Sequence, residues 1–125
     1  MCKSLRISIA DDEVDMRDYL ARILPRLGHE VVSAAGNGRQ LVADFQHFSP
    51  DLVITDVRMP ELDGLSAVRE IRRDRPVPVI IISAHQDTDL LQERQAGRTL
   101  VLTKPINRQS LQDAITGLMD GDGAV

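Results

Sequence analysis

The sequence predicts an α/β domain in which a parallel sheet is covered by helices on both faces. Short apolar runs alternate with amphipathic stretches along the whole chain. Five strand–helix units follow one another in strict alternation, which is typical of parallel strands joined by crossover helices. No two-residue turn joins neighbouring strand candidates, so we do not expect antiparallel hairpins.

The predicted strands are short runs rich in aliphatic and β-branched residues. The fourth run, Val79 to Ile82, is the most apolar and is typical of a strand buried on both faces. The first run ends at Asp11 and the third ends at Asp56. The predicted strands cover residues 5–10, 31–34, 52–55, 79–82 and 100–102.

Between these runs, apolar residues recur at helical spacing. Gly28 and Ser49-Pro50 are stop signals for the first two helices, and the fourth helix has the weakest pattern. The helices predicted first and fourth cover residues 14–27 and 87–95, and the apolar stripes that mark the other three lie within residues 41–48, 65–71 and 111–118. We therefore expect one domain over residues 1–119, followed at 120–125 by a flexible tail or the start of a linker.

The composition is that of a globular domain, with 42% hydrophobic and 27% charged residues in a chain of 125. A net charge of −4 argues against a surface that binds nucleic acid. The single cysteine, Cys2, cannot form an internal disulfide, which favours a reducing compartment. No apolar run is long enough to span a membrane, and the N-terminal segment lacks the core of a secretion signal. We therefore expect a cytoplasmic protein without membrane contacts.

Polar residues follow four of the predicted strands. Asp11 and Asp12 follow the first strand, Asp56 the third, Ser83 the fourth and Lys104 the fifth. The carboxyl ends of parallel strands lie along one edge of the sheet, which is where open α/β sheets bind ligands. Three carboxylates, a hydroxyl and an ammonium group are therefore expected to converge on one small surface.

This set of side chains suits phosphoryl transfer assisted by a divalent cation. Clustered carboxylates repel one another, and Mg²⁺, which prefers oxygen ligands, would remove that repulsion. Asp56 is placed to act as the nucleophile and to form an acyl phosphate. Phosphoryl transfer also needs positive charge near the phosphoryl oxygens. Lys104 could supply that charge, and Ser83 could donate a hydrogen bond.

Each of these residues also has an ordinary structural explanation when it is taken alone. The acidic triplet at 11–13 resembles a helix N-terminus, and Asp56 could simply begin a turn. Ser83 is an ordinary residue for the end of a strand, and Lys104 before a proline carries no information by itself. The joint placement at the ends of four strands is what favours a functional site.

Five ordered motifs resemble the receiver domain of two-component response regulators. The resemblance runs from Leu5 to Leu118 and implies a flavodoxin-like sheet with strand order 2-1-3-4-5 flanked by five helices. The motifs that carry it are Ile9-Ala10-Asp11-Asp12-Glu13, Thr55-Asp56-Val57-Arg58-Met59-Pro60, Asp63-Gly64-Leu65, Ser83-Ala84 and Thr103-Lys104-Pro105.

The resemblance implies a phosphoacceptor and a Mg²⁺ site. Asp56 matches the aspartate that receives a phosphoryl group from a sensor histidine kinase or a phosphotransfer protein. Asp12 and Asp56 match the direct ligands of Mg²⁺, and Asp11 matches a ligand that acts through water. Arg58 matches the residue that lends its backbone carbonyl to the ion.

The resemblance also implies a switch. Ser83 matches the hydroxyl that moves toward the phosphoryl group, and Lys104 matches the phosphate-binding lysine. The bond between Lys104 and Pro105 is expected to be cis, as is usual in this family. Phosphorylation would then change how the domain contacts an output domain or a partner.

Two departures from the family pattern affect that switch. Receivers commonly carry Tyr or Phe three residues before the lysine, where this chain has Val101, and the stretch from Ser83 to Gly97 is about one residue shorter than is typical. We therefore expect the response to rest on backbone shifts over residues 84–88. A second hypothesis is that Arg58 and His85 tune the loss of the phosphoryl group to water.

The resemblance leaves several partners open. An output domain C-terminal to this chain is one option. A homodimer through the face of the fourth helix, fifth strand and fifth helix is another, with Leu90, Leu91 and Leu111 as contributors or as ordinary core residues. Direct binding of nucleic acid by this domain is not expected.

Three other functions fit these residues less well. A dehalogenase-like phosphatase needs an acid two residues after its nucleophile, where this chain has Arg58. A flavin or nucleotide binder would need a Gly-rich phosphate loop after the first strand, where Asp11 and Asp12 would repel a phosphate. A degenerate receiver that acts as a phosphate-independent interaction module is favoured only by Val101. We therefore expect a module that catalyses only its own phosphoryl transfer and slow dephosphorylation, and no separate enzyme activity.

Overall fold

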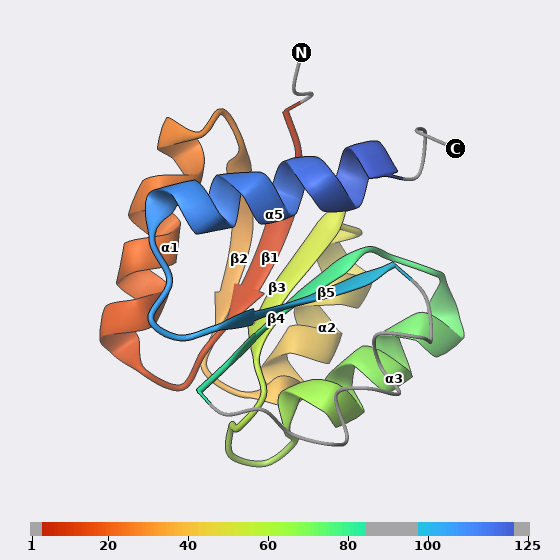
Figure 1. Ribbon diagram of the computed structural model, residues 1–125. Coiled ribbons are helices and arrows are strands. Elements are labelled where there is room, and N and C mark those ends of the chain that lie inside the picture. Colours follow the sequence, from red (N-terminus) through yellow and green to blue (C-terminus); the bar gives the residue numbers. More distant parts are fainter. Residues whose placement is uncertain (1–3, 85–97, 122–125) are drawn as a thin grey trace.

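The computed structural model describes residues 4–84 and 98–121 and contains one five-stranded parallel sheet (Figure 1). The strand order is β2-β1-β3-β4-β5, and all four neighbouring pairs are parallel. This confirms the predicted sheet. The strands are β1 (Arg6–Ala10), β2 (Glu30–Ala35), β3 (Leu52–Asp56), β4 (Val79–Ser83) and β5 (Thr99–Thr103).

Four helices lie within the described residues, and the helix predicted at 87–95 falls outside them. Two of the helices begin earlier than their apolar stripes indicated, because polar residues cap them. The Asn37 side chain accepts from the Gln40 N–H at the start of α2, and Asp63 accepts from the Ser66 N–H at the start of α3. The helices are α1 (Val14–Arg26), α2 (Gly38–Phe48), α3 (Gly64–Asp74) and α5 (Arg108–Gly121).

The sheet separates two hydrophobic cores (Figure 1). Helices α1 and α5 cover one face, and α2 and α3 cover the other. Ile80 and Ile82 of β4 belong to the first core, and Val79 and Ile81 belong to the second. Side chains alternate along a strand, so a strand that lies between two cores must be apolar throughout. This explains the uninterrupted apolar run that predicted β4.

Strand register brings four carboxyl ends to one edge of the sheet. Ala10 of β1 pairs with Thr55, and Asp56 of β3 pairs with Ile82. Ser83 of β4 pairs with Thr103 of β5. The segments that follow these strands therefore start side by side, which sets the position of the site.

The C-terminal helix extends beyond its apolar stripe at both ends. Its apolar stripe indicated 111–118, whereas α5 spans Arg108–Gly121. Asn107 precedes it and accepts from the Ser110 N–H, which accounts for the earlier start. Residues 122–125 of the expected tail lie outside the described part of the chain. None of the described helices is both long and apolar enough to cross a membrane.

Candidate functional site

Three aspartates meet at the carboxyl edge of the sheet. Asp11 and Asp12 lie just past β1, and Asp56 is the last residue of β3. One carboxylate oxygen from each lies within 4.8 Å of the other two. Asp11 and Asp56 are buried, and Asp12 is exposed. The predicted convergence of these three carboxylates is therefore observed.

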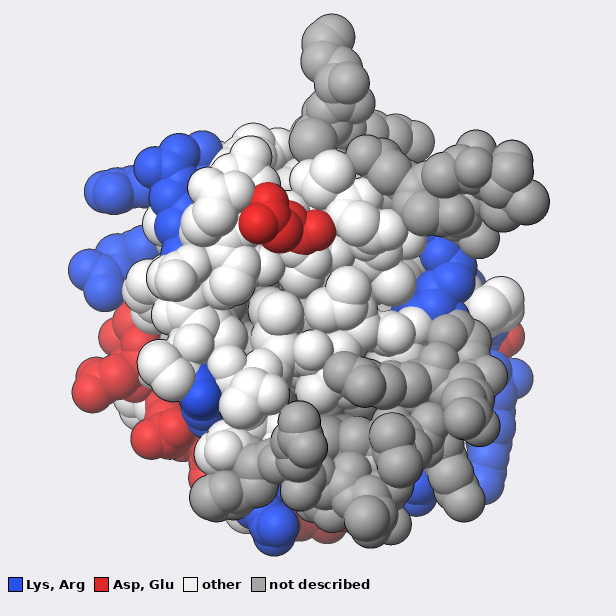
Figure 2. All heavy atoms as spheres, in the orientation of Figure 1, with Lys and Arg blue, Asp and Glu red and all other residues white. Residues whose placement is uncertain are grey.

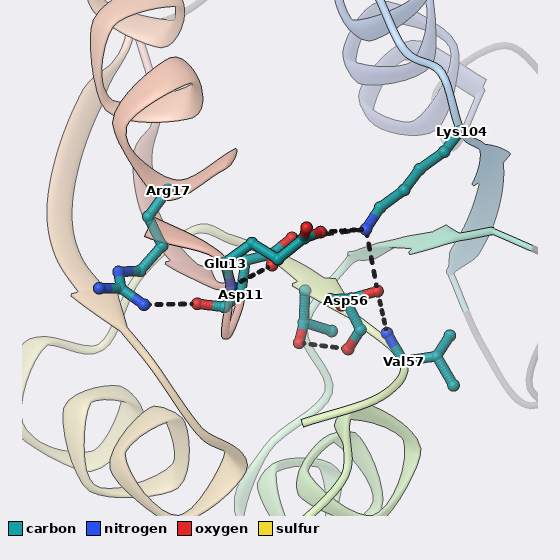
Figure 3. A network of polar contacts seen from close by, with 7 residues as sticks. Asp11, Glu13, Arg17, Asp56, Val57 and Lys104 are labelled. Carbon is teal, nitrogen blue, oxygen red and sulfur yellow. Dashed lines mark hydrogen bonds and ion pairs between the residues drawn. The ribbon is translucent and has the colours of Figure 1, made fainter. Parts of the chain in front are cut away.

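The backbone around Asp11 is held from both sides. Its Oδ1 accepts a hydrogen bond from the Glu13 N–H at 2.9 Å. Its carbonyl oxygen accepts one from Nη1 of Arg17 in α1 at 2.8 Å (Figure 3). The Arg17 side chain also fills the space beside Gly36, where an added Cβ would lie 3.1 Å from Nη1. These contacts fix the loop that presents Asp11 and Asp12.

Asp56 is fixed by its neighbours in the chain. Its Oδ1 accepts from the Val57 N–H at 2.9 Å, and its carbonyl oxygen accepts from the Thr55 hydroxyl at 2.9 Å. The Gly64 N–H donates to the Val57 carbonyl at 2.7 Å, which ties the start of α3 to the end of β3. The side chain of Asp56 is therefore oriented before any ligand arrives.

Lys104 reaches across the edge from the end of β5 and faces three carboxylates (Figure 3). Its Nζ lies 3.3 Å from Oε1 of Glu13 and 3.7 Å from Oδ1 of Asp56. Oδ2 of Asp11 lies at 4.0 Å. Only the contact with Glu13 is a hydrogen bond among these three. An ammonium group in this position can form an ion pair with an anionic group attached to Asp56.

Of the other residues singled out in the sequence, Ser83, Arg58 and Val101 lie within the described part of the chain. Ser83 is buried at the end of β4, and its carbonyl accepts from the Lys104 N–H at 2.8 Å. Arg58 is exposed, two residues past Asp56. Val101 lies on β5 opposite Ile81 and packs against the core under α2 and α3. His85 lies outside the described residues.

The peptide bond between Lys104 and Pro105 is cis, as the resemblance implied.

Burial raises the pKa values of the two buried carboxylates, Asp11 and Asp56. Desolvation raises the pKa of Asp11 to about 6, although the hydrogen bond from Glu13 N–H and the charge of Lys104 work against the rise. Desolvation likewise raises the pKa of Asp56, and Lys104 and the Val57 N–H offset part of it. Desolvation alone would lower the pKa of Lys104, but the facing carboxylates outweigh it, and the net pKa lies above its ordinary value.

The aspartate cluster fits a divalent cation. Oδ2 of Asp11 is buried and has no hydrogen-bond partner within residues 4–84 and 98–121. A buried carboxylate oxygen without a partner is costly, and a hard cation that prefers oxygen ligands would satisfy it. The observed spacing lets Asp11, Asp12 and Asp56 share one ion. Mg²⁺ keeps several waters in such sites, which leaves room for a phosphoryl oxygen.

Sequence reasoning did not assign roles to Glu13, Arg17 or Gly64. The side chain of Glu13 meets Lys104, which lies 91 positions away in the chain, and no local pattern reports a contact of that kind. Arg17 follows Glu13 by one helical turn, and its spacing from the acidic triplet was the available signal. Gly64 lies in the motif Asp63-Gly64-Leu65, but its contact with Asp56 forms only in the folded loop.

The family model of the response regulator receiver domain matches residues 7–116. The chain belongs to this family, whose members serve in two-component signalling. The predicted membership is therefore confirmed.

Curated relatives and solved structures agree with that assignment. The chain is 40% identical over 111 residues to the transcriptional regulatory protein PdtaR of Mycobacterium tuberculosis, which covers 88% of this chain and 54% of PdtaR. It therefore spans about half the length of that relative. It is 39% identical to the chemotaxis protein CheY of Bacillus subtilis, with 88% of this chain and 93% of CheY covered.

A response regulator receiver domain protein from Clostridium thermocellum has a very similar structure. Its TM-score is 0.82 at 31% identity, and the match covers 94% of this chain and 96% of that chain. The fold is thus the flavodoxin-like fold of CheY and its relatives, with the strand order that the resemblance implied.

Proposed function

We propose that this chain is a phosphorylation-controlled signalling module that accepts a phosphoryl group on Asp56 from a sensor histidine kinase or a phosphotransfer protein. The observation that carries the proposal is the position of Lys104, whose Nζ lies 3.7 Å from Oδ1 of Asp56 beside the aspartate cluster. Nucleophile, cation and metal ligands thus converge at one edge of the sheet. Membership of the receiver family supports the same conclusion.

The transfer forms one bond and breaks one bond. A carboxylate oxygen of Asp56 attacks the phosphorus of the donor's phosphohistidine, and the new P–O bond makes an acyl phosphate. The P–N bond of the donor breaks, and its electron pair returns to the imidazole nitrogen. Lys104 is placed to pair with a phosphoryl oxygen as negative charge gathers there. Ser83, at the end of the neighbouring strand, would donate a hydrogen bond to another phosphoryl oxygen.

Asp11, Asp12 and Asp56 would hold Mg²⁺, and the Arg58 backbone carbonyl would complete the protein ligands. Bound Mg²⁺ would neutralise the carboxylates and polarise the phosphoryl group. The buried oxygen of Asp11 that lacks a hydrogen-bond partner in the described residues supports this assignment. The hydrogen bonds from Glu13 N–H and Arg17 orient the loop for that task.

The response to phosphorylation is proposed to start at Ser83 and to pass through the backbone of residues 84–88, since Val101 has no ring to move. The fourth helix, expected at 87–95, and the contact face made by that helix, β5 and α5 remain predictions. The same holds for residues 1–119 as the extent of the domain. An output domain beyond this chain, or a partner protein, would receive the signal in the cytoplasm.

We propose neither a separate enzyme activity nor direct nucleic-acid binding for this domain. On the face drawn in Figure 2, the middle is occupied by uncharged residues around one acidic patch, and the described Lys and Arg residues lie toward the rim. A protein that binds the phosphate backbone of nucleic acid needs a continuous basic surface. The face in view offers none among its described residues.

Incubation with acetyl phosphate and Mg²⁺, followed by intact-mass measurement, tests the proposal. The wild-type protein should gain one phosphoryl group, and both Asp56→Asn and omission of Mg²⁺ should prevent the gain. A degenerate receiver, which Val101 favours, would gain no phosphoryl group under any of these conditions. A gain that persists in Asp56→Asn would instead place the acceptor elsewhere.

A further inference from the structure

In the resting protein, the charge of Lys104 is already engaged by a residue outside the proposed phosphoryl and metal sites. Glu13 lies in the loop after β1, and its Oε1 is the carboxylate oxygen nearest to Nζ of Lys104 among the three that face it. At 3.3 Å this contact is a hydrogen bond, whereas Asp56 lies at 3.7 Å (Figure 3). The ammonium group therefore lies closer to Glu13 than to either aspartate.

The side chain of Glu13 is not engaged by the first turn of α1. Glu13 occupies the N-cap position of α1, where a side chain normally accepts a hydrogen bond from the first turn. Its side chain makes no such cap bond. It extends instead across the sheet edge to Lys104, which directly follows β5 (Figure 3). The Glu13 side chain therefore contacts the proposed phosphate-binding cation and not the first turn of its own helix.

We propose that Glu13 is a positioning residue that holds Lys104 in the resting state and competes with the incoming phosphoryl group for it. This inference rests on the proposed function of Asp56. A phosphoryl group on Asp56 would need the ammonium that Glu13 now binds, and the Glu13 carboxylate would repel that group as it approaches. Release of Lys104 from Glu13 is then part of phosphoryl uptake, and the strength of this pair sets how readily the site loads.

The solvent exposure of Glu13 and Lys104 sets how much the loss of their ion pair should change phosphoryl uptake. The side chain of Glu13 is 66% exposed and that of Lys104 is 20% exposed, so solvent screens the pair. Exposed pairs of this kind correspond to changes of roughly two- to fivefold in an equilibrium or rate. Glu13→Gln removes the negative charge but keeps an oxygen that can accept from Lys104, and Glu13→Ala removes both.

The experiment compares initial rates of phosphoryl uptake from acetyl phosphate with Mg²⁺, followed by intact mass. Glu13→Gln should load roughly two- to fivefold faster than wild type at low ionic strength, and Glu13→Ala should load at least as fast as Glu13→Gln. The difference should shrink in about 1 M salt, where charges are screened over roughly 3 Å. Asp15→Asn is the matched control, because Asp15 carries the same charge in the first turn of the same helix. It should load like wild type.

Thermal unfolding separates this role from a structural one. A residue that only stabilised the start of α1 would shift the melting temperature without a salt-dependent change in uptake. Glu13→Gln that loads no faster than wild type, or Asp15→Asn that accelerates uptake equally, overturns the inference alone. A wild-type protein that takes up no phosphoryl group overturns the proposed function, and this inference with it.

Discussion

Gly64 lies directly against the backbone carbonyl of Asp56. A Cβ added at Gly64 would overlap that carbonyl oxygen and would come 3.2 Å from the Thr55 hydroxyl. The first residue of α3 is thus packed onto the last residue of β3 with no space between them. The position of the proposed phosphoacceptor depends on this close approach, since any side chain at Gly64 would push the two segments apart.

Gly64→Ala should therefore destabilise the protein and disturb the site together. Overpacking of this kind costs about 1–3 kcal/mol of unfolding free energy, measured by chemical denaturation. Phosphoryl uptake should also slow, because Asp56 and Val57 must shift. Gly117→Ala in α5 is the control: a Cβ there meets nothing within 4 Å, so stability should stay equal or rise by up to about 1 kcal/mol. Equal stability of the two variants would contradict the contact.

Arg17 should support cation binding without touching the ion. Its hydrogen bond to the Asp11 carbonyl holds the loop that presents Asp11 and Asp12. Arg17→Gln should weaken Mg²⁺ binding by roughly tenfold, since partners that orient ligands typically contribute that much. Isothermal titration calorimetry measures the change. Arg22→Gln, on the exposed surface of the same helix, removes an equal charge and should leave the affinity unaltered. The prediction fails if both variants bind Mg²⁺ equally well.

Mg²⁺ binding should weaken as the pH falls through about 6. Burial raises the pKa of Asp11 to about 6, so its carboxylate becomes protonated there and no longer serves as a ligand. Without Mg²⁺ the sign for stability is opposite to that of an ordinary ion-paired acid. The folded state holds its proton between the unfolded pKa of about 3.8 and the folded pKa of about 6, so stability falls as the pH rises through this window.

The melting temperature, measured across this pH range with and without saturating Mg²⁺, checks both statements. The rise in melting temperature caused by Mg²⁺ should be large near neutral pH and small near pH 5. The reason is that one proton competes with Mg²⁺ for the Asp11 carboxylate. Asp11→Asn should raise the stability of the metal-free protein at neutral pH by about 1 kcal/mol after allowance for solvent screening, and should remove most of the response to Mg²⁺. An unchanged response in Asp11→Asn would refute the assignment.

His29 should contribute a separate loss of stability in acid. Its Nδ1 accepts from the buried Leu5 N–H at 3.1 Å, and desolvation lowers its pKa below the ordinary 6.5. The unfolded chain therefore takes up the proton first, and stability from this residue is lost as the pH falls below about 6.5. His29→Asn keeps an acceptor but does not titrate. Denaturation at two pH values should show the wild type losing about 1 kcal/mol more than this variant, and an equal loss would exclude the effect.

The sheet and the aspartate cluster were predictable because they depend on local pattern. The alternation of apolar runs placed all five strands, and the rule that ligands gather at carboxyl ends brought Asp11, Asp12 and Asp56 together before the structure was known. The same rule predicted that Lys104 lies beside these aspartates.

Contacts that join distant parts of the chain were not predictable. Apolar spacing reports which face of a helix is buried but not where the helix starts, so α2 and α3 began earlier at their caps, Asn37 and Asp63. The pairing of Glu13 with Lys104 depends on the final separation of two loops, which no short segment encodes. The closeness of Gly64 to Asp56 is likewise a property of the folded loop.

Because β5 is an edge strand, the residues of the site are held in place with different stability. Asp11, Asp12 and Asp56 extend from β1 and β3, which have neighbours on both sides. Lys104 follows β5, whose single neighbour among the described strands is β4. Local opening is favoured where a segment has few buried contacts, and the residues of β5 are less buried than those of β3 and β4. Fraying of β5 would withdraw the ammonium and leave the acidic pocket whole. The proposed cation site therefore lies at the centre of the sheet, whereas the proposed phosphate-binding lysine follows an edge strand.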